Sequence, residues 1–267
     1  MSKLLKVSII ALVLLLIGVI GSLLTFRSSN EVVAVAETKK IAQPGIKSID
    51  VSVENAIVEI IPSKNNITKV ELTGKREPSS KQKLSATVNG ETLSVRLNEQ
   101  QFKFFNLNFL STELTLKVFV PEKLYKSIKV KCDNGYIKAT DLQANVLYAK
   151  TDNGRITLEN IKSTEANVNS DNGIIVLNHV EGKLSGKTNN GKITLKTKSL
   201  DRPIQLECDN GSVTVQTETE PTNATFDVHV DNGRVNILDK YSGSAVIGKG
   251  ENLIRLSTDN GRITITK

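Results

Sequence analysis

The chain of 267 residues has few of the side chains from which active sites are usually built. It contains two cysteines, two histidines, one methionine and no tryptophan. The histidines, His179 and His229, have no evident partners in the sequence and share no position in the repeat described below. They therefore indicate neither a catalytic nor a metal-binding centre. The net charge is +7, but no basic run is long, which argues against nucleic-acid binding.

The chain does contain one turn in seven copies. The glycines of these turns advance by 19, 19, 18, 20, 22 and 28 residues. A near-constant period of this size predicts a repeat architecture. The turns are Asp133-Asn134-Gly135, Asp152-Asn153-Gly154, Asp171-Asn172-Gly173, Asn189-Asn190-Gly191, Asp209-Asn210-Gly211, Asp231-Asn232-Gly233 and Asp259-Asn260-Gly261.

Apolar residues alternate with polar ones on both sides of every turn. Around the first turn, Ile128 and Val130 precede the glycine, and Ile137 and Ala139 follow it. Alternation with period two predicts strands that bury one face. An array of hairpins and a β-solenoid would both place these side chains inside. Stacked coils demand equal lengths, so the near-constant period favours an all-β solenoid with coils of ~19 residues.

The residues of the turn suggest local structural roles. Asn-Gly suits two successive residues with positive φ, and the leading aspartate can accept a backbone hydrogen bond two residues on. A ladder of aspartates could instead bind calcium. We expect no metal or cofactor, because cations that follow the glycine would neutralise the acids. These cations are Arg155, Lys192, Arg234 and Arg262.

The cysteines are predicted to be free and buried. An exported pair would ordinarily suggest a disulfide. However, Cys132 and Cys208 both lie three residues before a turn glycine, four coils apart. Stacked coils would separate them by about 19 Å, which is too far for a disulfide.

The N-terminal region predicts a membrane anchor over residues 1–27. Residues 7–26 form an uncharged run of 20 residues, long enough to cross a membrane as a helix. Lys3 and Lys6 favour a cytoplasmic N-terminus and an extracytoplasmic C-terminal domain. A cleaved signal peptide is the alternative, with Ala34-Val35-Ala36 as the cleavage site. No cysteine follows the run, so a lipoprotein anchor is not supported.

The rest of the chain divides into three segments. Residues 28–44 are expected to form a stalk or linker. Residues 45–127 read as irregular β structure that caps the solenoid, with Glu54-Asn55-Ala56 as a worn copy of the turn. Residues 128–267 hold the regular repeats. Four aromatic residues form either a partner patch or a plug for the open core: Phe102, Phe104, Phe105 and Phe109.

Two strands and the turns carry a family resemblance. Residues 56–63 read AIVEIIPS, residues 116–122 read LKVFVPE, and the Asp-Asn-Gly turns follow. Together they resemble the bacterial putative-adhesin family of unknown function, which includes LiaG-like membrane-anchored proteins of Gram-positive bacteria. The resemblance implies a β-helical extracytoplasmic domain linked to cell-envelope stress, and it implies no catalytic residues.

The sequence thus predicts a non-catalytic, membrane-anchored module with a binding or regulatory role in the envelope stress response. The expected partners are the membrane, through the single N-terminal span, and envelope-stress membrane proteins or envelope polymers. A surface adhesin is the alternative, and a polysaccharide-active β-helix enzyme is a more distant one.

Overall fold

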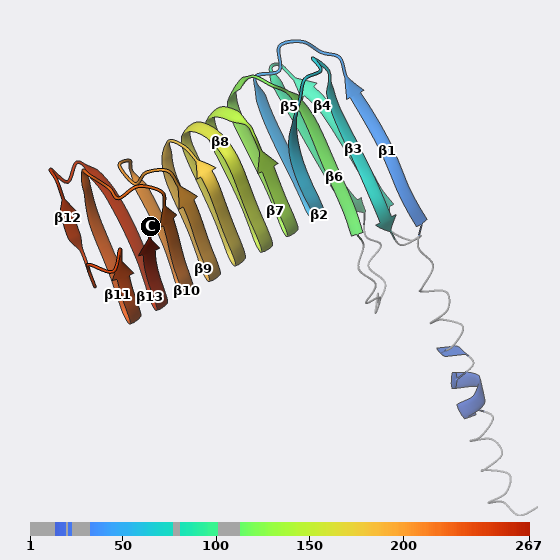
Figure 1. Ribbon diagram of the computed structural model, residues 1–267. Helices are drawn as coiled ribbons and strands as arrows, with labels where there is room; N and C mark the ends of the chain where they lie inside the picture. Colours follow the sequence, from blue (N-terminus) through green and yellow to red (C-terminus); the bar gives the residue numbers. More distant parts are fainter. Residues whose placement is uncertain (1–13, 20, 23–32, 77–80, 101–112) are drawn as a thin grey trace, which may run out of the picture.

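The computed structural model describes residues 14–19, 21–22, 33–76, 81–100 and 113–267. Apart from helical residues 14–19 and 21–22, its regular structure is one sheet of 13 strands, wound into a stack of bent ribbons (Figure 1). The strands are β1 (Val33–Ile41), β2 (Ser48–Ser63), β3 (Thr68–Arg76), β4 (Lys81–Asn89), β5 (Thr92–Gln100), β6 (Glu113–Pro121), β7 (Leu124–Thr140), β8 (Gln143–Val180), β9 (Lys183–Thr197), β10 (Ile204–Thr217), β11 (Ala224–Ile237), β12 (Ala245–Ile247) and β13 (Asn252–Thr266).

The repeats form a β-solenoid, which confirms the predicted fold and excludes the hairpin array. Strand β7 pairs in parallel with β8, β8 with β9, and β9 with β10. The register aligns each turn with its neighbour, as in Gly135 with Gly154 and Gly191 with Gly211. Each long strand bends at its Asn-Gly corner, and β8 supplies two successive coils. The coils return through a second, less regular turn, which we call the opposite corner.

The core lies inside the coils, at the positions that the alternation predicts. Ile137 and Ala139 after the first corner are buried, as are Ile128 and Val130 before it. The same positions in the neighbouring coils stack on these, so that β-branched and leucine side chains form continuous rows. Burial of these rows is the main favourable term in the stability of such a stack.

The C-terminal end of the stack departs from chain order. Strand β13 pairs in parallel with β10 on one side and with β11 on the other. The last coil in the sequence therefore lies between its two predecessors, and β11 stands outside it with the short strand β12. The longer spacing before Gly261 accommodates the segment that returns the chain to this inner position.

The N-terminal end of the regular stack begins earlier than predicted. Strand β2 pairs in parallel with β7, and Asn55 aligns with Asn134. Glu54-Asn55-Ala56 is thus the corner of a first coil, as the sequence suggested, and the boundary at residue 128 is wrong. On the other side of β2, pairing with β5 ends at Val53 and pairing with β6 begins at Ile57.

Antiparallel strands complete this end. β4 and β5 form a hairpin, β3 pairs with β6, and β1 pairs with β3 along its whole length. Residues 33–41 are therefore a sheet strand rather than part of a linker, which corrects the predicted stalk over 28–44. One face of this strand, which carries Val35, Glu37, Lys39 and Ile41, is half-buried on the sheet. Cleavage at Ala34-Val35-Ala36 would remove part of this strand.

Among the described residues, no helix is both long and apolar enough to span a membrane. Most of the predicted span, residues 7–26, falls outside the described ranges, so the anchor remains a prediction. The predicted patch of Phe102, Phe104, Phe105 and Phe109 also lies outside them.

Candidate ligand-binding face

A ladder of asparagines runs along the Asn-Gly corner. Each asparagine donates its side-chain Nδ2 to the Oδ1 of the asparagine in the adjacent coil. For example, Asn172 donates to Asn153 over 3.1 Å, and Asn190 donates to Asn172 over 2.8 Å. In spatial order the ladder contains Asn55, Asn134, Asn153, Asn172, Asn190, Asn210, Asn260 and Asn232.

The ladder, rather than a positive φ, explains why asparagine occurs at this corner. Within the described ranges, no asparagine of the Asn-Gly corners has positive φ; the non-glycine residues that do are Asp141, Asn160, His179, Leu238 and Asp239. The first three of these lie at the opposite corner. Asparagine therefore occupies the Asn-Gly corner because its amide is both donor and acceptor, which permits an unbroken chain of side-chain bonds.

The corner glycines are required by close approach between coils. A Cβ on Gly191 would overlap the carbonyl oxygen of Gly173 in the neighbouring coil. Gly191 also has a φ of 142°, a region that favours glycine. The first coil has Ala56 in place of glycine. On the outer side of β2, pairing with the described strands is interrupted between Val53 and Ile57, so no paired strand lies against Ala56 there.

The aspartates of the corner point toward the strand segment that precedes it. Lys150 contacts Asp152 at 3.0 Å, and His229 contacts Asp231 at 2.8 Å. Each base is two residues before its acid, so both side chains leave the strand on one face. We call this outward surface before the corner glycines the leading face. No corner aspartate in the described segments accepts the backbone bond that the sequence predicted.

We call the outward surface after the corner glycines the trailing face, and in the last four coils of the stack it carries cations without acids. Its side chains are those one, three and five residues after each glycine. In the four coils of β9, β10, β13 and β11, these positions hold Lys192, Lys196, Arg262 and Arg234 and no carboxylate. Arg155, Lys192, Arg234 and Arg262 do not neutralise the corner aspartates, contrary to prediction. The reason is that the corner directs acids and cations to opposite faces.

Lys192, Arg234 and Arg262 line an open groove of about 730 Å³ on the trailing face. Lys192 aligns with Ser212, Ser212 with Arg262, and Arg262 with Arg234, so the four side chains form one row across four strands. Thr214 and Thr264 line the groove beside them. Lys192, Arg234 and Arg262 are exposed, and none makes a side-chain ion pair or hydrogen bond within the described part of the chain. We call these residues the cationic groove.

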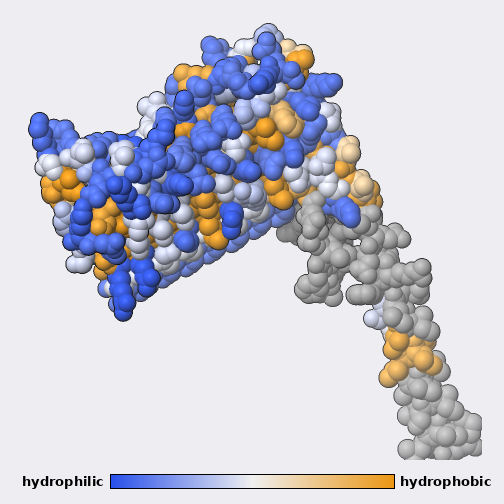
Figure 2. All heavy atoms as spheres, viewed as in Figure 1, coloured by the Kyte–Doolittle hydropathy of each residue, from blue (hydrophilic) through white to orange (hydrophobic). Residues whose placement is uncertain are grey.

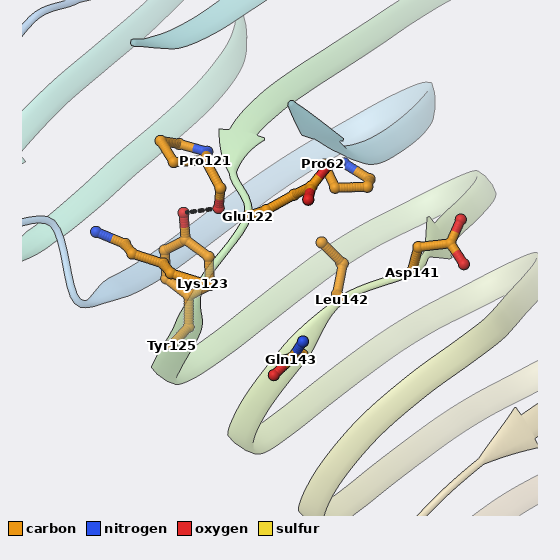
Figure 3. Close-up of a pocket in the computed structure, with 8 residues that line it drawn as sticks. All are labelled: Pro62, Pro121, Glu122, Lys123, Tyr125, Asp141, Leu142 and Gln143. Atoms are coloured by element: carbon orange, nitrogen blue, oxygen red, sulfur yellow. Dashed lines mark hydrogen bonds between the residues drawn. The ribbon is translucent and has the colours of Figure 1, made fainter. Parts of the chain in front are cut away.

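Two smaller cavities lie at the opposite corner. One, of about 290 Å³, lies beside Tyr125, whose hydroxyl donates to the Pro121 carbonyl over 2.9 Å (Figure 3). Burial raises the pKa of Tyr125 to about 12. The other, of about 410 Å³, is lined by Lys162, His179 and Arg202 among others. Arg202 donates hydrogen bonds to the backbone carbonyls of Val180 and Gly182, so its guanidinium has a structural role.

Neither the cysteines nor the histidines form a reactive centre. Cys132 and Cys208 are free and buried, as predicted, and burial raises the pKa of each thiol to about 11. His179 contacts Glu218 at 3.0 Å and His229 contacts Asp231, both on the surface. The described residues contain no group of three or more His, Cys, Asp or Glu side chains placed to hold a metal ion.

Sequence comparison identifies the family. Two overlapping segments, residues 46–162 and 134–266, match the family Toastrack DUF4097. The chain belongs to the Toastrack DUF4097 family. This confirms the resemblance to a family of unknown function, and the Toastrack match spans both the first coil and the regular stack. No curated protein matches the chain.

Solved structures of similar proteins are distant. A putative cell adhesion protein from Clostridium sporogenes shares 14% identity with a TM-score of 0.40, covering 88% of this chain and 99% of that chain. A putative adhesin from Bacteroides fragilis shares 11% identity with a TM-score of 0.46, covering 88% and 97%. Neither tells what this Toastrack chain binds, because both TM-scores are low.

Proposed function

We propose that this Toastrack protein is a non-catalytic binding module held at the outer face of the cell membrane, with a regulatory role in the envelope stress response. The observation that carries the proposal is the trailing face of β9, β10, β13 and β11, where positive charge is present without an acid on the same face. Solenoids offer extended surfaces of this kind to elongated ligands and partners. Hydrophilic residues predominate on the visible surface of the coils, and hydrophobic ones form small separate groups (Figure 2).

A binding role fits the chemistry of the described residues better than catalysis. General acid–base or nucleophilic catalysis requires a base within hydrogen-bond reach of a reactive group. The two histidines belong to separate surface ion pairs, and the thiols are buried with raised pKa values. The acids of the corner are matched by neighbouring bases on the leading face in several coils.

Placement outside the membrane rests on the apolar run at residues 7–26 and on Lys3 and Lys6 before it. An epitope tag after Lys267 tests it. We expect antibody to reach the tag on intact spheroplasts. A tag that reacts only after lysis would contradict this placement.

The regulatory role is tested in cells that lack the protein. We expect the deletion to change the induction of envelope-stress genes by wall-active antibiotics, and the full-length chain to restore it. Unchanged induction across several such antibiotics would contradict a role in this response.

A further inference from the structure

We propose that the cationic groove binds a linear phosphodiester polymer, whose phosphates lie along the row formed by Lys192, Ser212, Arg262 and Arg234. This inference names the site and the chemistry of the ligand for the proposed binding function. It rests on that function, because the polymer would be met outside the membrane.

The charges of the groove are arranged for an anion. Arg262 and Arg234 lie directly opposite each other on neighbouring parallel strands, and like charges so placed repel. No described carboxylate pairs with either arginine. An anion lying between them would remove this repulsion, and guanidinium groups can bind phosphate oxygens in bidentate fashion.

The spacing of the row indicates an extended ligand. Neighbouring strands are about 4.8 Å apart, so the row spans about 14 Å from Lys192 to Arg234. It runs across the strands, along the axis of the stack. A single small anion can contact only part of this row, whereas a polymer with a charge in each repeat can contact all of it. The groove is shallow and open to solvent, unlike the enclosed pockets that bind small molecules.

The lining of the groove favours a flexible phosphodiester over ligands built of rings. Its side chains are lysine, arginine, serine and threonine, and no aromatic residue lines it. Proteins that bind single-stranded nucleic acids use aromatic side chains on which the bases stack. The hydroxyls of Ser212, Thr214 and Thr264 can donate to oxygen acceptors between the charges of a phosphodiester chain.

The position of the groove favours a polymer over the head groups of the membrane that anchors the chain. The groove centres on β10 and β13, and β13 is eight strand steps from β1 in the order of the sheet. Because β8 supplies two successive coils, nine ribbon spacings separate β1 from β13. At about 4.8 Å per spacing, that separation is about 43 Å. The N-terminal segment enters the fold through β1, so the groove lies at the far end of the stack (Figure 1).

The test is a titration of the purified full-length chain, in neutral detergent, with synthetic poly(glycerol phosphate) at low salt. We expect the combined variant K192Q/R234Q/R262Q to lose at least ~10-fold in affinity. The slope of log K against log salt should fall by about 2–3, since each lost phosphate contact removes about one unit. The variant R234K/R262K keeps the charge and loses the bidentate geometry, so we expect a smaller loss of about 3-fold.

The matched control is K126Q/K129Q/K131Q. These lysines cluster on β7 outside the groove, and their replacement removes the same charge. The control should bind like the wild type. Equal losses in both combined variants, or no binding by the wild type, would overturn the inference. So would tighter binding of polygalacturonate, or of phosphatidylglycerol vesicles, than of poly(glycerol phosphate). These outcomes are independent of the tag experiment, which tests the placement of the chain.

Discussion

The two corners of each coil follow different rules. The Asn-Gly corner has the same side-chain bond and the same close backbone approach from coil to coil. The opposite corner is less constant. Asp141, Asn160 and His179 share a positive φ there but differ in side chain, and Arg202 and Asp201 form different bonds further along the stack. Repetition at one corner fixes the rise of the coils, whereas variation at the other accommodates differences in coil length.

The same comparison explains where cavities and ligands are placed. Two cavities lie at the opposite corner, where no side-chain ladder closes the surface. The Asn-Gly corner instead separates the corner aspartates from the cations that follow the glycine, so the faces beside it differ in charge.

Gly191→Ala should disrupt the Asn-Gly corner most strongly. The new methyl group would overlap the Gly173 carbonyl, and its residue would have to keep a φ of 142°. We expect a loss of about 3–5 kcal/mol in the free energy of unfolding, measured by urea denaturation. Gly243→Ala is the control, because nothing lies within 4 Å of its added Cβ. A similar loss in both variants would contradict the close-approach argument.

Asn172→Ala should interrupt the asparagine ladder. It removes the bonds to Asn153 and from Asn190, and leaves their exposed partners to water. We expect a loss of about 1–2 kcal/mol. At the opposite corner, Asn160→Gly keeps the positive φ and removes one bond to Asp141, so its loss should be smaller. The reverse order of the two urea midpoints would show that the ladder contributes little.

Asp201 at the opposite corner should make stability depend on pH. Partial burial raises the pKa of this carboxyl, but bonds from the Asn223 and Thr222 amides and from the Thr222 hydroxyl outweigh it and lower the pKa below 3.8. A lowered folded pKa contributes stability above the ordinary value, and that stability is lost as pH falls through the folded value.

Between about pH 5 and pH 2, the wild type should therefore lose more stability than Asp201→Asn. Thermal unfolding across this range measures the difference. Parallel curves for the two proteins would mean that Asp201 does not contribute.

Cys208→Thr should have the smallest effect. Cys208 aligns with Thr188, and the thiol and hydroxyl at this position face backbone carbonyls of the Asn-Gly corner. We expect the free energy of unfolding to change by less than ~1 kcal/mol. A larger loss would show that this coil requires the thiol for packing.

The regular stack could be predicted because its repeating unit is local. Alternation around Gly135 identifies the buried face, and equal spacing identifies the coils. The order of the last two coils could not be predicted, since β13 has the same pattern whether it lies inside or outside β11. Likewise, β1 shows no period-two alternation of apolar and polar residues, and only its pairing with β3 distinguishes it from a linker.

The candidate site was missed for a related reason. The sequence places Arg234 and Arg262 close to aspartates, and linear distance suggests neutralisation. The strand geometry decides otherwise, because residues one after and two before the glycine leave on different faces. The signal available in the sequence was the absence of acids at one, three and five residues after the last four glycines.

The inner position of β13 has a consequence for how the protein folds. A solenoid whose coils follow chain order can grow like a zipper, each coil adding to the one before it. Here β11 has no parallel partner until β13 has taken its place between β10 and β11. The final part of the stack must therefore wait for a contact between segments 50 residues apart along the chain, such as Asn210 and Asn260. During synthesis, β11 should remain exposed until β13 has left the ribosome or the export channel, and chaperones would act on that interval.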